Sequence, residues 1–202
     1  TPFTTCMFVM TLFRTLPVFL TILICCALPS PLQANEADDA DPWEIWKRDG
    51  VHALMRHAVA PGTGDPANFR IGDCSTQRNL DQTGRDQARE TGRKIKEIGI
   101  RIDLVLSSEW CRCVDTATLL DLGPVTTEPS LNSFFRDRST ERTQTRQITD
   151  LLSELPPGTK TLLVTHQVNI TALTGIYPRS GEIILIRPTE NGKIETLARL
   201  IP

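Results

Sequence analysis

Two adjacent side chains at the end of a short apolar run could hold and attack a phosphate group. The run from Val51 to Met55 is followed by Arg56 and His57, and then by a stretch rich in proline and glycine, 61–66, which forbids a long helix. A guanidinium binds phosphate through two parallel hydrogen bonds, and a neutral imidazole is a nucleophile. The pattern indicates a β-strand with phosphoryl-transfer chemistry at its carboxyl end.

Two further apolar runs end in side chains of the same kinds. Residues 102–106 read as a buried strand, and Arg112 falls in the first turn of the helix expected after it. Residues 161–166 read as another strand, whose last residue is His166. Open α/β sheets bind their ligands at the carboxyl ends of strands. If the strands are parallel neighbours, the two arginines and two histidines reach one pocket.

The elements that must position these residues alternate between strands and helices. Alternation along the first strand sends Val51, Ala53 and Met55 to one face and His52, Leu54 and Arg56 to the other, so His52 is expected to be structural. The periodicity predicts helices over 83–98, 109–121, 141–155 and about 168–174, a short edge strand over 125–127, and a closing hairpin of 182–187 and 194–200.

The long irregular stretch that ends at Asp81 is a candidate lid over the pocket. Loops of this length inside a compact domain are commonly functional. The stretch contains several potential donors to an anion, namely Arg70, Ser75, Thr76, Gln77 and Arg78.

Composition indicates one ordinary globular domain. The chain has 202 residues, 40% of them hydrophobic, and 22 Lys and Arg against 24 Asp and Glu give a net charge of −2. This balance argues against nucleic acid as a partner and against an electrostatic grip on an anionic membrane. Any anion must therefore be bound by a local cluster of cations.

The first 34 residues have the profile of a secretory signal peptide. They contain no acidic residue and an apolar run over 16–28, and an acidic stretch begins beyond Ala34. We predict cleavage after Ala34, a start at Met7 or Met10, no stable membrane insertion after cleavage, and a secreted or periplasmic location. An uncleaved anchor is the alternative. Residues 35–50 would form a polar leader whose Trp43 and Trp46 pack on the body as a helical turn.

Three of the six cysteines remain beyond the predicted signal peptide. Cys74, Cys111 and Cys113 would lie in a compartment that permits disulfides. One bridge from Cys74 to Cys111 or to Cys113 with a free thiol is one interpretation, and three buried thiols is the other. The Cys-x-Cys spacing without further ligands is a poor zinc site.

Four sequence blocks, in order, resemble those of the histidine phosphatase superfamily, the phosphoglycerate-mutase-like proteins. The blocks are 54–58 (LMRHA), 80–88 (LDQTGRDQA), 107–112 (SSEWCR) with Thr116-Ala117, and 164–166 (VTH). The resemblance covers residues 51–202 and implies a three-layer α/β/α sandwich with a mainly parallel central sheet. It implies His57 as the nucleophile that becomes phosphohistidine, Arg56 and Arg112 as the phosphate clamp, and His166 as the second pocket histidine. It also implies no metal and no cofactor.

Two positions depart from the family pattern beyond the mild change to Ala58 after His57. The leaving-group acid is usually a Glu in a Leu-Asn-Glu-like stretch, but this chain reads Leu131-Asn132-Ser133. Glu109 is the first substitute and Asp137 the second. Gln167 stands where acid phosphatases and phytases carry Asp, which disfavours that subgroup and leaves Gln167 as a phosphate-binding candidate.

The expected function is that of an exported, metal-independent phosphatase acting on a small phosphorylated substrate, a phosphomonoester. The alternative is a low-turnover phosphate-binding or scaffolding protein of the same fold, which has kept the cations and lost the acid.

Overall fold

The computed structural model describes residues 40–202 as a sheet covered by helices on both faces. The predicted signal peptide, its cleavage site and the start of the polar leader lie outside the described residues. No helix between residues 40 and 202 combines the length and apolar character needed to cross a bilayer. The strands are β1 (His52–Arg56), β2 (Leu104–Ser107), β3 (Val125–Thr127), β4 (Thr161–Thr165), β5 (Ile183–Pro188) and β6 (Ile194–Leu200). The helices are α1 (Pro42–Lys47), α2 (Gln82–Glu97), α3 (Cys111–Leu120), α4 (Glu141–Glu154) and α5 (Gln167–Thr174), with short 3-10 turns η1 (Cys74–Thr76), η2 (Pro129–Leu131) and η3 (Arg138–Thr140).

The sheet has the strand order β3-β2-β4-β1-β5-β6. Pairings from β3 through β1 are parallel, whereas β5 runs antiparallel to β1 and to β6. The α/β/α sandwich is therefore confirmed, with a sheet that is parallel on one side and antiparallel on the other. The expectation that the strands of Arg56 and Arg112 could be direct neighbours is wrong, because β4 lies between β1 and β2. The carboxyl ends of all three strands still meet at one edge.

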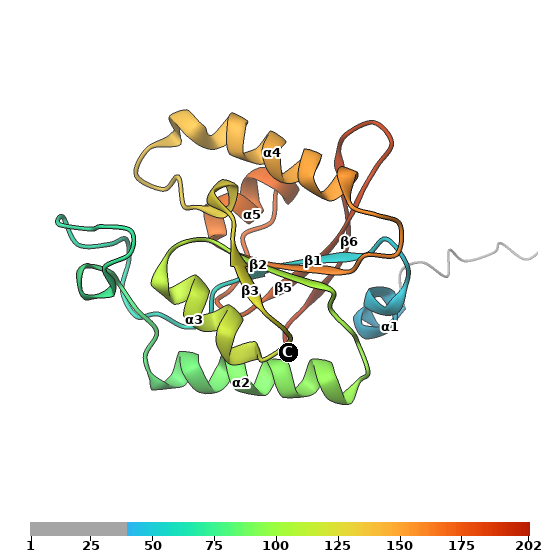
Figure 1. Cartoon of the computed structure of the whole chain (residues 1–202), viewed down its shortest axis with the longest axis horizontal. Helices are drawn as coiled ribbons and strands as arrows, with labels where there is room; N and C mark the ends of the chain where they lie inside the picture. The colour runs from blue at the N-terminus through green and yellow to red at the C-terminus, as the bar shows by residue number, and fades with distance from the viewer. Residues whose placement is uncertain (1–39) are drawn as a thin grey trace, which may run out of the picture. The chain divides into compact units, whose positions relative to one another are not determined.

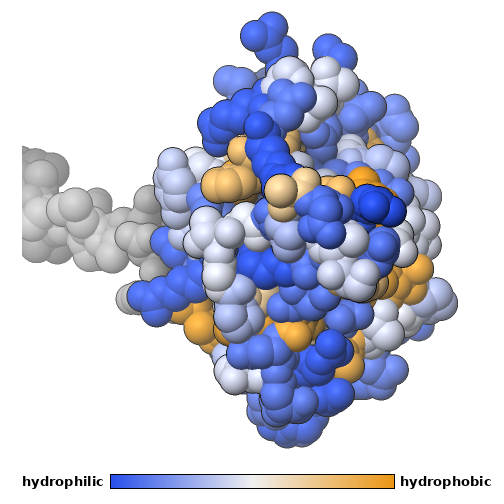
Figure 2. All heavy atoms as spheres, turned by 90° about the vertical axis from the view of Figure 1, so that its left-hand side faces the viewer, coloured by the Kyte–Doolittle hydropathy of each residue, from blue (hydrophilic) through white to orange (hydrophobic). Residues whose placement is uncertain are grey.

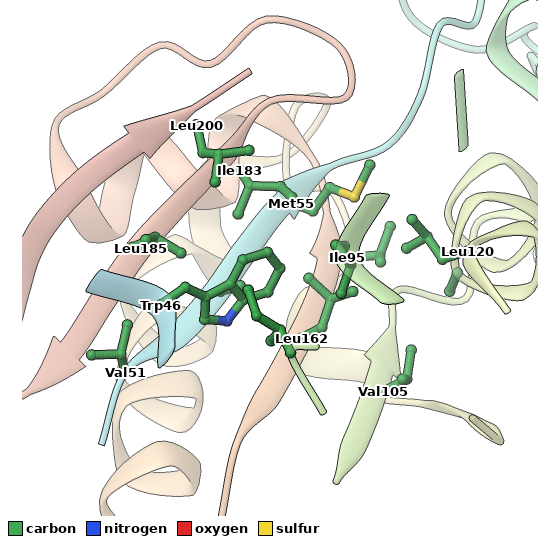
Figure 3. Close-up of a cluster of buried hydrophobic side chains, with 14 of the residues drawn as sticks. Trp46, Val51, Met55, Ile95, Val105, Leu120, Leu162, Ile183, Leu185 and Leu200 are labelled. Carbon is green, nitrogen blue, oxygen red and sulfur yellow. The ribbon is translucent and has the colours of Figure 1, made fainter. Parts of the chain in front are cut away.

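Side-chain alternation divides the core into two layers. Val51, Ala53 and Met55 pack with Trp46 and residues of α2 and α3 below the sheet in Figure 1. Leu54 packs with residues of α4 and α5 above it. Figure 3 shows the first layer, in which side chains from α1, the sheet and the helices converge. The predicted assignment of the two faces is confirmed.

The helical turn predicted around the two tryptophans is α1, and it packs on the body. Trp46 is buried, and its ring lies 6.0 Å from that of Trp43. The Lys160 ammonium donates hydrogen bonds to the carbonyl oxygens of Trp46 and Arg48, at 2.6 and 2.9 Å. These bonds satisfy carbonyls at the helix end that would otherwise lack a partner. His52 also has a structural role, since its Nδ1 lies 2.9 Å from Thr161 Oγ1 in the neighbouring strand.

Candidate active site

The three polar strand ends meet in one cavity of about 410 Å³. Its lining includes Arg56 and His57 after β1, Arg112 in the first turn of α3, and His166 and Gln167 after β4. The cavity lies at the edge where the parallel strands end, on the face that Figure 2 turns toward the viewer. That face is mostly hydrophilic with small hydrophobic groups of atoms among the polar ones. Five of the six predicted site residues are thus brought together.

His57 is held so that one ring nitrogen faces the cavity as an acceptor. Its backbone N–H donates to the carbonyl of Thr165 at 3.0 Å, which ties it to β4. Its Nδ1 lies 2.8 Å from the carbonyl oxygen of Ala58, which can only accept, so Nδ1 carries the proton. Nε2 then has a free lone pair, and it accepts a hydrogen bond from Arg112 Nε at 3.2 Å.

The surroundings of His57 keep its ring neutral. Burial is the largest cause, followed by the charge of Arg112, and together they lower the pKa of His57 to about 3, although the hydrogen bond to Ala58 opposes the shift. The side chain is 2% exposed. At neutral pH His57 Nε2 is therefore unprotonated, and its lone pair accepts the hydrogen bond from Arg112 Nε.

Arg112 is bound along two edges of its guanidinium. The inner edge faces the histidines, with Nε donating to His57 Nε2 and Nη2 to His166 Nδ1 at 3.4 Å. The outer edge makes a buried ion pair with Asp65, in which Nη1 and Nη2 donate to the two carboxylate oxygens at 2.7 and 3.2 Å. The inner edge is the one that a phosphate bound at His57 would meet.

Asp65 is a site residue that the sequence did not indicate. Besides Arg112, it accepts hydrogen bonds from Trp110 Nε1 at 3.0 Å and from the backbone N–H of Arg78 at 3.1 Å. Burial opposes the ionisation of Asp65, but these donors outweigh it and lower the pKa of the carboxyl below its ordinary value. Asp65 lies between a glycine and a proline that are typical of turns, and no sequence pattern relates it to Arg112, 47 residues further along the chain.

His166 is the second buried histidine of the cavity, and its ring centroid lies 5.6 Å from that of His57. Its Nε2 lies 2.9 Å from Ser108 Oγ, and Ser108 Oγ in turn donates to Asn132 Oδ1 at 3.1 Å. Nε2 is therefore the protonated nitrogen. Burial, and then the charge of Arg112, lower the pKa of His166 well below its ordinary value.

Besides Arg112, three arginines line the cavity, namely Arg56, Arg78 and the exposed Arg136. Arg56 Nη1 donates to the carbonyl of Pro178 at 2.9 Å, and its Nε is buried without a protein partner. Arg78 Nε donates to the carbonyl of Gly64 at 2.8 Å. Of the five loop donors expected to reach an anion, Arg78 is the one among the lining residues. The side chains of Ser75 and Thr76 donate hydrogen bonds within the loop. Gln77 joins the loop to α3, since it donates to the Arg70 carbonyl and accepts from the Cys111 N–H, both at 2.9 Å.

The two acid candidates occupy different places. Glu109 is not among the lining residues, and its carboxylate accepts a hydrogen bond from Asn132 Nδ2 at 2.6 Å. Asp137 lines the cavity, but it caps η3, and hydrogen bonds from the Ser139 side chain and backbone lower its pKa below the ordinary value. Of the two candidates, Asp137 is thus the one that lines the cavity, and Glu109 lies outside the lining with its carboxylate bound to Asn132.

The irregular stretch between β1 and α2 is fastened to α3 by a disulfide. The bridge joins Cys74 in η1 to Cys111, the first residue of α3, while Cys113 is a free, buried thiol. This confirms one of the two pairings expected from sequence and excludes three buried thiols. Burial raises the pKa of the Cys113 thiol to about 12, so it is not a thiolate nucleophile. No cluster of three or more potential metal ligands occurs between residues 40 and 202.

Comparison with known proteins supports the assignment suggested by the sequence blocks. The model of the histidine phosphatase superfamily (branch 1) matches residues 53–149. The serine/threonine-protein phosphatase Pgam5, mitochondrial, of Drosophila persimilis is 26% identical over 94 residues, which are 46% of this chain and 32% of that protein. The match thus spans about a third of the length of such curated relatives.

Solved structures share the fold along nearly their whole length. The protein histidine phosphatase SixA complexed with tungstate superimposes with a TM-score of 0.54 at 18% identity, over 74% of this chain and 96% of that one. A SixA structure from Nakamurella multipartitia gives a TM-score of 0.55 at 16% identity, over 77% and 97%. At these identities the likeness shows the fold alone. The family model and the ordered sequence blocks agree that residues 53–149 are similar to the histidine phosphatase superfamily.

Proposed function

We propose that the protein is a phosphatase that transfers a phosphoryl group to Nε2 of His57 and then to water. One observation carries the proposal. The Nε2 lone pair of a neutral, buried histidine faces a cavity lined by Arg56, Arg112 and His166, and its Nδ1 proton is held by the Ala58 carbonyl. This is the arrangement that in-line attack on phosphorus requires.

The first step forms a bond between His57 Nε2 and phosphorus while the bond from phosphorus to the ester oxygen breaks, and its electron pair leaves with that oxygen, which takes a proton from solvent. A phosphate oxygen that takes over the hydrogen bond from Arg112 Nε frees the lone pair for attack. The ring gains positive charge as the bond forms, and the Ala58 carbonyl, which accepts from Nδ1–H, stabilises that charge. The arginines and the His166 ring stabilise the negative charge spread over the phosphoryl oxygens.

The second step returns the enzyme to its starting state. Water attacks phosphorus, the bond to Nε2 breaks, and the ring recovers its lone pair while inorganic phosphate leaves. Departure of the inorganic phosphate lets Arg112 Nε donate to Nε2 again, as in the structure.

A trapping experiment tests the proposal. Brief incubation with a ³²P-labelled phosphomonoester and a denaturing quench should leave label that survives alkali and is lost in acid, as a phosphoramidate does. His57→Ala should abolish both the label and turnover, and Arg56→Ala should lower turnover by several orders of magnitude because a charge-assisted contact with the transition state is lost. Label on serine, or turnover that His57→Ala leaves intact, would refute it.

The same experiment separates a phosphatase from a phosphate-binding or scaffolding protein. A binding protein should retain inorganic phosphate or tungstate without forming label. We further propose that turnover needs no metal, so treatment with a chelator should leave the rate unchanged. A rate that falls with chelator and returns with a divalent cation would contradict this.

We also propose that residues 1–34 direct export to a secreted or periplasmic location, on the strength of their acid-free apolar sequence. Mass spectrometry of the protein from its own host should then find an N-terminus at Asn35. A chain that retains the apolar segment would identify an anchor instead.

A further inference from the structure

The cavity extends beyond the phosphate-binding residues along an aromatic wall. Phe69 stacks on Trp110 with 4.8 Å between ring centroids and 22° between their planes, and the Trp110 ring meets His166 edge-on at 5.2 Å. Phe135 also lines the cavity and is 57% exposed. A volume of about 410 Å³ is within the range of pockets that enclose a whole small ligand. The apolar surface is thus placed to receive the group that carries the phosphate.

The same cavity offers no carboxylic acid to protonate a leaving group. The carboxylates among its lining residues are Asp65 and Asp137. Asp65 is bound by Arg112, Trp110 and the Arg78 backbone, and Asp137 is bound by Ser139. A leaving group that needs a proton, such as an alkoxide, therefore departs slowly. A phenolate is far more stable, because a phenol has a pKa of about 10.

We propose that the leaving group is a phenol ring, so that the substrate is an aryl phosphomonoester whose ring packs against Phe135 and the Phe69–Trp110 stack. The inference rests on the proposed function for the chemistry at His57. It adds the class of substrate, which neither the arginine clamp nor the histidines determine.

The reaction balances without an acid from the protein. His57 Nε2 attacks phosphorus, the bond between phosphorus and the ring oxygen breaks, and the electron pair leaves with the phenolate, which takes a proton from solvent. Water then attacks the phosphohistidine and releases inorganic phosphate, to which the remaining proton of that water is transferred. The sum is aryl phosphate and water giving a phenol and phosphate.

Two substrates with equally acidic leaving groups separate ring recognition from leaving-group stability. Phenyl phosphate is compared with a fluorinated alkyl phosphate whose alcohol is as acidic as phenol. The full-length protein should show kcat/KM about tenfold higher for the aryl compound, because aromatic packing adds affinity beyond the buried area. The difference should lie in KM, since the ring packs equally well before and during the reaction. Equal kcat/KM values for the two compounds would overturn the proposal.

Substitutions at the wall locate the preference. Phe135→Ala removes a ring that is already exposed, so the fold is retained, and the ratio of aryl to alkyl kcat/KM should fall from about ten to about one. Tyr177→Ala is the matched control, because Tyr177 is an aromatic side chain, 72% exposed, outside the cavity lining. It should keep the ratio. A ratio that Phe135→Ala leaves at its wild-type value would refute the aromatic wall.

Failure of this inference and failure of the proposed function give different results. If alkali-stable label forms on His57 but the two compounds react equally, the phosphatase mechanism stands and the aryl assignment fails. If no label forms while aryl compounds still bind more tightly than alkyl ones, the wall is real and the mechanism is wrong. A phosphotyrosyl peptide tested beside phenyl phosphate shows whether the phosphorylated ring belongs to a polypeptide or to a free small molecule. If both aryl substrates react more slowly than the alkyl compound, the inference is overturned.

Discussion

Arg112 is held at two edges, and the carboxylate at its outer edge determines where its inner edge points. The side chains of Arg112 and Asp65 are 4% and 10% exposed. A buried guanidinium without a partner is costly, and three other arginines line the same cavity. In the absence of phosphate, the carboxylate of Asp65 neutralises the charge of Arg112. Its two oxygens bind the outer edge of the guanidinium, so that Nε and Nη2 face the histidines.

We predict that Asp65→Ala lowers kcat about a hundredfold, because a clamp misplaced by an ångström loses its contact with the transition state. Breaking the buried pair should also cost about 3 kcal/mol of stability. Asp65→Asn keeps one acceptor oxygen for Arg112 and should recover part of the rate. Steady-state kinetics on an aryl phosphate, with thermal unfolding to check folding, measure both effects.

A double-mutant cycle distinguishes positioning from a general structural effect. If Asp65 acts through Arg112, then Asp65→Ala should add little to the loss caused by Arg112→Ala. Losses that multiply would contradict this role. A rise in activity on Asp65→Ala would mean that the carboxylate competes with phosphate for Arg112.

The residue scale also shows what sequence spacing cannot predict. Glu109 lies three residues before Arg112, which made it the first substitute for the missing acid. The helix begins at Cys111 and not at 109, so Glu109 stays in the loop before α3, where Asn132 binds its carboxylate and its backbone N–H. The contact depends on a residue far along the chain, which no local pattern indicates.

At the scale of elements, the helices fix the chain just after His57. Gln87 of α2 accepts from the Val59 N–H and donates to the Ser180 carbonyl, both at 3.0 Å. Thr116 of α3 accepts from the Ala58 N–H at 3.0 Å. Two of the sequence blocks that carry the family resemblance therefore contribute contacts that hold the nucleophile loop in place.

Gly84 allows the first of these contacts because α2 lies against the backbone of Val59. A Cβ at Gly84 would come within 2.0 Å of the Val59 carbonyl oxygen, and one at Gly92 would come equally close to the Leu120 carbonyl oxygen. Gly84→Ala and Gly92→Ala should thus both lower the melting temperature by several degrees, since backbone must shift.

The two variants should differ in activity. Gly84→Ala displaces the chain two residues from His57, so kcat per folded molecule should fall at least tenfold. Gly92→Ala moves the contact between α2 and α3 away from the cavity and should keep kcat. Thermal melts followed by circular dichroism measure stability, and kcat is normalised to the amount of phosphohistidine formed in the first turnover. Equal losses of kcat in the two variants would show that Gly84 has no particular link to the nucleophile.

The elements themselves were predictable because their cause is local. Strands such as β1 and β4 are short apolar runs bounded by polar residues, and a two-residue period fixes their faces. Their order in the sheet was not predictable in the same way, since the placement of β4 between β1 and β2 depends on contacts between distant segments. The choice of Cys111 over Cys113 as the partner of Cys74 has the same origin, because the two differ in which way they project from α3.

At the scale of the whole molecule, all three histidines are buried and held neutral. Burial, with the charge of Lys160, lowers the pKa of His52 to about 4, and burial with Arg112 lowers that of His57 to about 3. The pKa of His166 is lowered as well. In the unfolded chain each has a pKa near 6.5.

The sign of the effect on stability follows from proton binding. Between about pH 6.5 and pH 4 the unfolded chain binds protons that the folded protein does not, so the free energy of unfolding decreases as the pH falls through this window. We predict that the melting temperature is level from pH 8 to 7 and drops by many degrees toward pH 4, while kcat at moderate acidity is not limited by protonation of His57.

His52 provides the test because it lies outside the cavity and touches only the fold. His52→Gln can keep a hydrogen bond to Thr161 while removing one of the three titrating groups, so the melting temperature should fall less steeply between pH 6.5 and 4 than in the wild type. The quantity compared is the slope of the melting temperature against pH. The absolute melting temperature is not used, because the changed side-chain volume also affects it. A slope unchanged by the substitution would mean that His52 binds its proton equally in the folded and unfolded states.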